Sequence, residues 1–354
     1  MTTHPKPNLF DWATSELSQD AFLSWLINWA DPKYQSFDPN LYQCAVQFVR
    51  SLLKDNNHLE IQTIKVERQW KHIDVLVTIN DNIIIVIEDK TFTSEHSNQL
   101  TRYTEEVKAK FSTAHIHKIY FKMHEQSNYN TILAAGFCPY TRKEMLSVLN
   151  EYIALSSSER KNDIVVDFHL YLTNLENNIG KYLTIKLNDW DKWYCWQGFY
   201  TALQKEFNDG DWGYVSNPSG GFIGYWWHWK HIPDPEKDYK FRFYLQLERE
   251  KFVIKININS EDKNICNKIR RKLQDIVFEE ADQQHIPWEK YGRYGNYMAI
   301  ALLFPKNQEE DIINPKSYLQ TNNEGLLDLP ATIQRLKKAM ALLDTVYHRA
   351  SKEI

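Results

Sequence analysis

The sequence predicts an α/β fold, in which a mixed sheet flanked by helices precedes a C-terminal α+β domain. Three observations support this class. Two amphipathic helices lead into three consecutive strand-like segments. A helix and a further strand follow, and this connection is long enough for parallel pairing. After residues 185–191, long aromatic strands begin that suit a largely antiparallel sheet.

Length and composition set the outer limits. With 354 residues, of which 43% are hydrophobic, the chain should form about two domains, which we place at residues 1–185 and 186–354. The net charge of -4 gives no general attraction to nucleic acid, so such binding would need local basic patches or a metal ion. No apolar segment approaches the roughly 20 residues that span a bilayer, and no signal-peptide pattern is visible. We therefore expect a cytoplasmic protein without a membrane partner.

The N-terminal part begins with two helices. Residues 14–30 predict the first, because Leu17, Ala21, Trp25 and Trp29 recur at helical spacing and a proline follows. These four residues are expected to form its apolar face. Residues 40–54 predict the second helix, which the turn-forming residues 55–57 end.

Three strands are expected at residues 60–70, 72–79 and 83–90. The turn residues 80–82 join the second and third strands into an antiparallel hairpin. The third strand is apolar at every position from 83 to 87, which is typical of a central strand buried on both faces.

Further elements complete this domain. We expect a helix at 94–111, a strand at 115–123 and a helix at 142–155. Residues 163–175 also look helical, although their Ile-Val-Val run would suit a strand.

The C-terminal half is expected to fold as an α+β domain. Helices are predicted at 190–207, at 263–278 and from residue 330 onward, and strands at 220–232, 240–248, 251–259 and 297–304. The aromatic stretch 225–231 could stack on nucleic-acid bases, but aromatic residues in a strand more often fill a core. We interpret the last helix as packing, against this domain or a partner subunit.

The chemistry is concentrated at the end of the third strand, where Glu88, Asp89 and Lys90 follow the apolar run. Strand alternation directs Glu88 and Lys90 to one face and Asp89 to the other. A three-residue turn would place Asp74 opposite Glu88, whereas a loop of two or four residues would place it opposite Asp89. The first register therefore predicts a carboxylate pair on neighbouring strands.

Such a pair would lie roughly 5 Å apart and would need a cation to neutralise it. Mg²⁺ fits, with Mn²⁺ as a substitute, because it prefers carboxylate and water oxygens. Lys90 could then place its ammonium near a water on the metal or near charge that develops on phosphorus.

Asp74, followed after a hairpin by Glu88-Asp89-Lys90, resembles the D…(D/E)-x-K core of the PD-(D/E)XK nuclease superfamily. The resemblance covers about residues 14–125 and implies a restriction-endonuclease-like fold. Ile73 stands where the namesake proline would be, a position that contributes no metal ligand.

Two helices extend the resemblance. Gln99 and Tyr103 stand four residues apart on one helical face, which is similar to the Q-x-x-x-Y motif of the RecB-like branch. In that branch these side chains help to position the metal ligands and the nucleic-acid backbone. Glu16 corresponds to an acidic residue of the first helix that reaches the metal site in many members, and Asp20 shares its face.

The resemblance thus implies catalytic roles for Asp74, Glu88, Lys90, Gln99 and Tyr103, with Glu16, Asp74 and Glu88 as metal ligands. The implied function is a Mg²⁺-dependent nuclease that hydrolyses phosphodiester bonds in DNA, in phage defence or DNA repair. RNA would fit the same chemistry.

Two other classes of function stay open. One is a catalytically silent nuclease fold that binds nucleic acid or a protein. The other is an interaction module in which the aromatic C-terminal domain drives assembly, and the N-terminal site acts only when a partner supplies the contacts to DNA.

Overall fold

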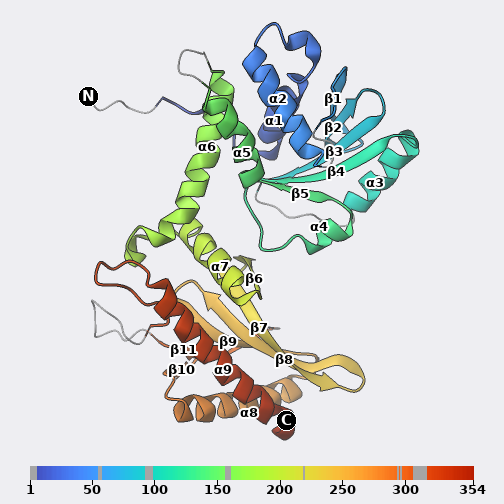
Figure 1. The fold of residues 1–354 in the computed structure, drawn as a ribbon. Coiled ribbons are helices and arrows are strands. Elements are labelled where there is room, and N and C mark those ends of the chain that lie inside the picture. Colours follow the sequence, from blue (N-terminus) through green and yellow to red (C-terminus); the bar gives the residue numbers. More distant parts are fainter. Residues whose placement is uncertain are drawn as a thin grey trace. The chain divides into compact units, whose positions relative to one another are not determined.

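The computed structural model describes residues 6–54, 58–91, 99–155, 161–217, 220–292, 295, 297–305 and 317–354. The chain forms two compact units, Met1–Glu176 and Asn177–Ile354 (Figure 1). The division falls within helix α6 (Asp163–Gly180), which therefore contributes residues to both. The domain boundary after residue 185 stays a prediction.

A five-stranded mixed sheet forms the first unit, and its strands stand in chain order. Strands β1, β2 and β3 are antiparallel, and β3, β4 and β5 are parallel. Their bounds are β1 Ile64–Trp70, β2 Ile73–Ile79, β3 Ile83–Lys90, β4 His115–Lys122 and β5 Cys138–Thr141. The predicted mixed sheet is confirmed.

Helices cover both faces of this sheet (Figure 1). Because β3 is central, its odd-numbered residues pack with helices α1, α2 and α5, and its even-numbered residues pack with α3. The helical bounds are α1 Glu16–Asn28, α2 Pro39–Leu52, α3 Gln99–Lys110, α4 Asn130–Ala134 and α5 Arg142–Ile153. All eight residues of β3 are buried, so its charged end lies within the protein between two helical layers.

The predicted apolar face of α1 is correct for Trp25 and Trp29, which pack against the core, and wrong for Leu17 and Ala21, which are exposed. Leu17 is 60% exposed, whereas Phe22, Leu23, Leu26 and Ile27 are buried. Helix α1 carries apolar residues around most of its circumference, so their spacing alone did not show which side meets the sheet.

Other boundaries differ in smaller ways. Residues 60–63 precede β1 rather than belonging to it, and residues 163–175 lie in α6, which settles their ambiguous pattern as a helix. Strand β5 and the five-residue helix α4 were not predicted, because both are too short for a periodic pattern. The predicted start of the helix at residues 94–98 lies outside the described residues.

The second unit contains a six-stranded antiparallel sheet in the order β10-β11-β9-β8-β7-β6. Its strands are β6 Asp211–Val215, β7 Phe222–Asp234, β8 Lys237–Glu248, β9 Lys251–Ile258, β10 Trp288–Lys290 and β11 Tyr297–Leu303. Its main helices are α7 Tyr194–Phe207, α8 Lys263–Gln283 and α9 Leu329–Glu353. The predicted α+β domain is confirmed, although the short strands β6 and β10 were not foreseen.

Aromatic residues of β7 belong to the core of this unit. Tyr225 and Trp227 are fully buried, and their rings stack with centroids 4.8 Å apart. Leu336 and Leu343 of α9 are buried in the same core. The aromatic stretch 225–231 and the last helix therefore serve mainly as packing elements.

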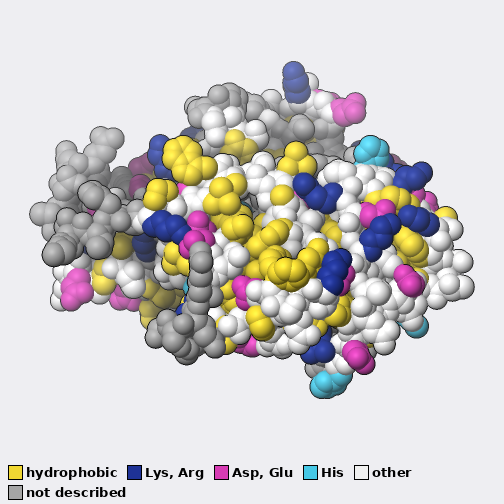
Figure 2. Space-filling view, turned by 90° about the horizontal axis from the view of Figure 1, so that it is seen from above, with side chains coloured by type: hydrophobic (Ala, Val, Ile, Leu, Met, Phe, Trp, Pro, Cys, Tyr) yellow, Lys and Arg dark blue, Asp and Glu magenta, His cyan; other side chains and the backbone are white. Residues whose placement is uncertain are grey.

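The face drawn in Figure 2 shows single lysine and arginine side chains among apolar and acidic ones. No continuous basic patch appears on its described part, in line with the net charge of -4. None of the helices in the described ranges is both long and apolar enough to cross a membrane.

A buried histidine, His124, is expected to make the first unit sensitive to acid. Burial and the charges of Arg142 and Lys122 lower the pKa of His124 from 6.5 to about 4. Between these two pH values His124 is protonated in the unfolded chain but neutral in the folded protein. The free energy of unfolding should therefore fall as the pH drops from about 6.5 to about 4. The loss is expected to reach about 3 kcal/mol. Urea unfolding of His124→Gln across this range should show a flatter pH dependence.

The exposed His348 provides the control for this measurement. His348→Gln should retain the wild-type pH dependence. An unchanged slope in His124→Gln would contradict the assignment of the acid sensitivity to His124.

Candidate active site at the end of strand β3

The β2–β3 hairpin has the three-residue register that the sequence favoured. Ile79 pairs with Ile83 and Val75 with Ile87, so the same register places Asp74 opposite Glu88. The alternative pairing of Asp74 with Asp89 is thereby ruled out.

Asp74 is held between neighbouring backbone and side-chain donors. Its Oδ2 accepts a hydrogen bond from the backbone amide of Asp89 at 2.9 Å, and its Oδ1 accepts one from Nε2 of Gln69 at 3.2 Å. The carboxylate therefore has a fixed position at the ends of β2 and β3.

Glu88 and Lys90 form a buried ion pair on the α3 side of the sheet. Lys90 Nζ lies 2.5 Å from Glu88 Oε1 and donates a hydrogen bond to the backbone carbonyl of Asp89 at 3.2 Å. Glu88 is fully buried, and within the described structure neither of its oxygens has a partner with hydrogen-bond geometry. The Lys90 ammonium is therefore a positive charge directly beside Glu88 when this buried carboxyl group ionises.

The electrostatics of this pair determine what each group can do. Burial, strengthened by the charge of Asp74, raises the pKa of Glu88 to about 8. Burial lowers the pKa of Lys90, but Glu88, Asp74 and Glu16 outweigh that effect and leave it above its ordinary value. Lys90 is consequently an ammonium at neutral pH and acts as a positive charge rather than a proton acceptor.

Glu16 reaches the same edge from the first turn of α1. Its Oε1 accepts a hydrogen bond from the backbone amide of Thr91 at 3.2 Å, and its Oε2 lies 4.0 Å from Lys90 Nζ. Ser15 caps this helix by accepting a hydrogen bond from the amide of Ser18, which fixes the turn that carries Glu16. The acidic residue of the first helix is thus beside the Lys90 ammonium.

Gln99 and Tyr103 interact on α3, as their spacing indicates. Gln99 Nε2 donates to the Tyr103 hydroxyl at 2.6 Å, and this hydroxyl donates to the backbone carbonyl of His72. Tyr103 is fully buried, and burial raises its pKa. The pair therefore attaches α3 to the chain two residues before Asp74.

A second acidic pair lies on the opposite face of β3. Asp20 and Asp89 are both fully buried, and Gln19 donates a hydrogen bond to Asp89. Neither oxygen of Asp20 has a hydrogen bond with correct geometry among the described residues. Burial, with the Asp74 charge, raises the pKa of Asp20 to about 7, and burial also raises that of Asp89. Asp20 and Glu88 therefore lie on opposite faces of β3, and the charge of Asp74 acts on both.

Because Asp20 is buried beside Asp89, we predict that Asp20→Asn raises the free energy of unfolding of the metal-free protein. The folded protein holds the Asp20 proton up to about pH 7, whereas the unfolded chain releases it near 3.8. Stability therefore falls as the pH rises through that window, and the asparagine variant should avoid the loss. We expect a gain of about 2 kcal/mol at pH 8 by urea unfolding, and much less at pH 4.

Asp81→Asn, at an exposed turn position, is the matched control and should change little. A loss of stability in Asp20→Asn at pH 8 would show that the buried carboxylate has a favourable partner there.

A profile of the PD-(D/E)XK nuclease superfamily matches residues 7–186. The chain belongs to this superfamily. The match covers half of the chain and includes every residue of the site described above. Neither a search of curated proteins nor a search of solved structures gave a significant match.

The resemblance inferred from the motifs is thereby confirmed at the level of the superfamily. PD-(D/E)XK proteins are usually nucleases that hydrolyse phosphodiester bonds, and they typically use divalent metals. The functions of the individual site residues stay predictions.

The donor set fits a hard divalent cation in part. Glu88 offers two buried oxygens that need positive charge, and the Asp74 charge acts on it directly. Within the described ranges, however, no three His, Cys, Asp or Glu side chains converge as a ready metal-binding group. Asp74 and Glu88 are the pair that would hold an ion, whereas Glu16 contacts Lys90 and the backbone amide of Thr91.

Lys122 belongs to the basic strand that the sequence suggests either as a flank of the phosphate path or as a solvated face, and the structure places it near the site. It pairs with Lys90 in the parallel β3–β4 register and is 2% exposed. Its Nζ donates to the carbonyl of Thr91 at 2.9 Å, and burial lowers its pKa to about 8. The sequence predicted that β4 could pair in parallel with β3. It did not predict that Lys122 lies beside Lys90, because the register depends on where the connection between the two strands ends.

Proposed function

We propose that the protein is a divalent-metal-dependent nuclease that hydrolyses phosphodiester bonds in DNA. The observation that carries this proposal is the meeting of Asp74, Glu88 and Lys90 at one end of a buried strand, in the order of the superfamily motif. RNA is the second substrate that the same chemistry would accept.

In this proposal Asp74 and Glu88 hold Mg²⁺ or Mn²⁺, and Glu16 completes the set. When bound, the ion would polarise a phosphoryl oxygen and offset the charge that develops on it. Lys90, which Glu88 keeps protonated, would orient the attacking water and stabilise negative charge on the phosphate. Gln99 and Tyr103 would act as positioning residues, because they attach α3 to the segment that leads into Asp74.

The second unit would select the substrate or a partner, which includes a second copy of the chain. In this proposal the nuclease acts in the cytoplasm. Its role would be in phage defence or DNA repair, because both processes require DNA cleavage.

The direct test incubates the purified protein with supercoiled plasmid, linear duplex, single-stranded DNA and RNA. Cleavage is expected with Mg²⁺ or Mn²⁺ and not with EDTA. The Asp74→Ala variant separates this activity from a contaminant, because it should be inactive under all conditions. Equal cleavage by Asp74→Ala, or by wild type in EDTA, would overturn the proposal.

A catalytically silent nuclease fold is the second candidate. The observation that favours it is the Glu88–Lys90 ion pair, because Lys90 already supplies the positive charge that a metal would bring. Calorimetric titration with Mg²⁺ and Mn²⁺ separates the two candidates. If the protein binds the metal and Glu88→Gln weakens that binding, the nuclease is supported. If the protein binds DNA but no metal, the silent fold is supported.

A further inference from the structure

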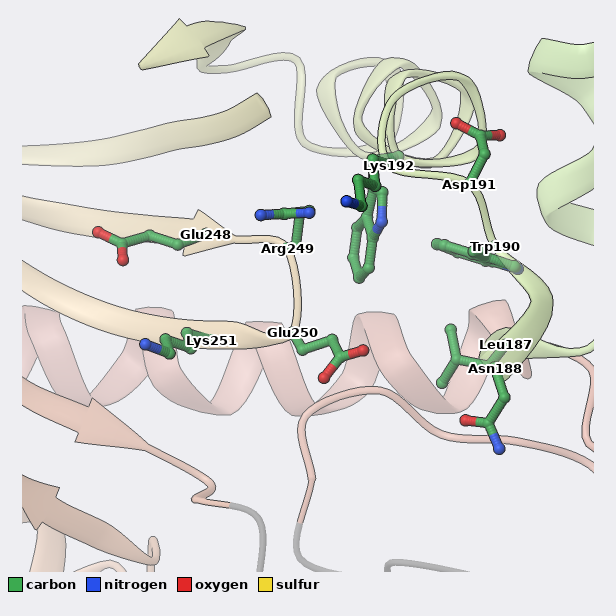
Figure 3. Close-up of a pocket in the computed structure, with 10 residues that line it drawn as sticks. Leu187, Asn188, Trp190, Asp191, Lys192, Glu248, Arg249, Glu250 and Lys251 are labelled. Atoms are coloured by element: carbon green, nitrogen blue, oxygen red, sulfur yellow. The ribbon is translucent and has the colours of Figure 1, made fainter. Parts of the chain in front are cut away.

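A pocket of about 350 Å³ lies in the second unit, outside the residues that the superfamily profile matches. Its size suits a small molecule. Residues before α7, together with Trp196 of its first turn, form one wall, and the β8–β9 turn forms the other (Figure 3). Trp190 and Trp196 contribute an aromatic surface, and their rings meet edge-on with centroids 4.9 Å apart.

Two positive charges are available to a ligand in this pocket. Figure 3 shows Lys192 and Arg249 extending their charged ends toward one another. Neither charged end has a hydrogen bond or an ion pair with another described residue. Two positive charges on the lining of one pocket favour an anion there.

The acidic residues around the pocket are mostly engaged elsewhere. Asp191 accepts hydrogen bonds from the backbone amides of residues 193, 194 and 195 and so caps α7. Glu248 points away along its strand and forms an ion pair with Lys255 at 3.4 Å. Glu250 alone directs its carboxylate toward the Leu187 side of the pocket.

Arg249 stands in a backbone conformation that arginine seldom adopts. It is the first of two residues in the β8–β9 turn and has φ +55°, a position that suits glycine or asparagine. Two fully buried tyrosines hold it there. The hydroxyl of Tyr200 accepts a hydrogen bond from the Arg249 amide at 2.9 Å, and that of Tyr318 donates to its carbonyl. The fold thus maintains an unfavourable conformation at the residue whose guanidinium enters the pocket.

We propose that this pocket binds a nucleotide phosphate, with Arg249 and Lys192 holding the phosphate and Trp190 contacting the base. A planar guanidinium and an ammonium together suit phosphate oxygens, and an indole suits a base. The phosphate belongs either to a free nucleotide or to the 5′ end of a DNA strand. Binding here does not depend on cleavage by the first unit.

The test is calorimetric titration in EDTA, where metal-dependent cleavage is absent. The probes are dAMP, deoxyadenosine, inorganic phosphate and one oligonucleotide with either a 5′-phosphate or a 5′-hydroxyl. We expect dAMP or the phosphorylated strand to bind at least about tenfold more tightly than its counterpart without phosphate. Much tighter binding of the phosphorylated strand than of dAMP assigns the site to a strand end, and the reverse order assigns it to a free nucleotide.

Arg249→Asn is the decisive variant, because asparagine accepts the left-handed turn and the fold should lose nothing. Its melting temperature should equal or exceed that of wild type, while the affinity falls at least about tenfold. Lys192→Ala should weaken binding in the same way, and Lys205→Ala, an exposed lysine of α7, should not.

Three outcomes would overturn the proposal. The first is that neither dAMP nor the phosphorylated strand binds. The second is that a stably folded Arg249→Asn variant binds with unchanged affinity. The third is that inorganic phosphate binds as tightly as dAMP. Binding that persists in Asp74→Ala supports a site separate from the candidate active site.

Discussion

Lys90→Ala should reduce cleavage by about 10²–10³-fold, because it removes the only ammonium in contact with Glu88 among the described residues. The remaining carboxylates, Asp74, Glu88 and Glu16, would then face one another and the substrate phosphate without that charge. The measurement is the initial rate of plasmid cleavage in Mg²⁺, with folding checked by circular dichroism. Lys65→Ala is the matched control, since Lys65 is an exposed lysine on β1 of the same sheet.

Lys90→Arg sharpens the interpretation. Arginine keeps a positive charge beside Glu88 but cannot act as a base at any working pH. Because the pKa of Lys90 lies above its ordinary value, we expect the arginine variant to retain more activity than Lys90→Ala. Activity within about twofold of wild type in Lys90→Ala would refute the electrostatic role of Lys90, given the effect that loss of such a group normally has.

Arg142→Ala should lower the free energy of unfolding of the first unit by about 3 kcal/mol. Arg142 is 1% exposed, and its guanidinium donates to Glu176 at 2.8 Å and to the carbonyl of Met123 at 2.7 Å. The variant would leave that carbonyl unpaired inside the protein and would separate α5 from α6 and the end of β4. Urea unfolding followed by circular dichroism measures the loss.

Arg349 provides the comparison for this prediction. It also contacts glutamates, namely Glu279, Glu280 and Glu353, but its side chain is 31% exposed and only Glu280 among the three is buried. Arg349→Ala should therefore change stability little, because water replaces exposed ion pairs at small cost. If Arg142→Ala and Arg349→Ala lower the free energy of unfolding equally, burial does not explain the contribution of Arg142 to stability.

The sequence was most informative where pattern and turn chemistry agree. The apolar run of β3 and the turn residues 80–82 predicted a hairpin with two possible registers, and the structure adopts the three-residue turn that brings Asp74 to Glu88. The spacing of Gln99 and Tyr103 likewise foretold a contact that the helix provides. These features depend on local geometry, which a single sequence determines well.

Features that depend on distant packing could not be predicted in the same way. Leu17 looked like a core residue because its helical spacing was correct, yet only the position of α1 against the sheet decides which face is buried. The burial of Asp20 with Asp89 has the same cause, since the two residues lie on separate elements. The left-handed backbone conformation of Arg249 could not be predicted from the sequence, because arginine does not favour that conformation.

The chain-order arrangement of the first sheet has a consequence for how the candidate site assembles during folding. Asp74 and Glu88 lie on the two arms of one hairpin, so closing a three-residue loop brings them together. Such a closure involves little entropy and typically takes microseconds, whereas the parallel pairing of β4 must wait for a whole crossover. The acidic pair is therefore expected to meet early, before the strand that carries Lys122 arrives beside it.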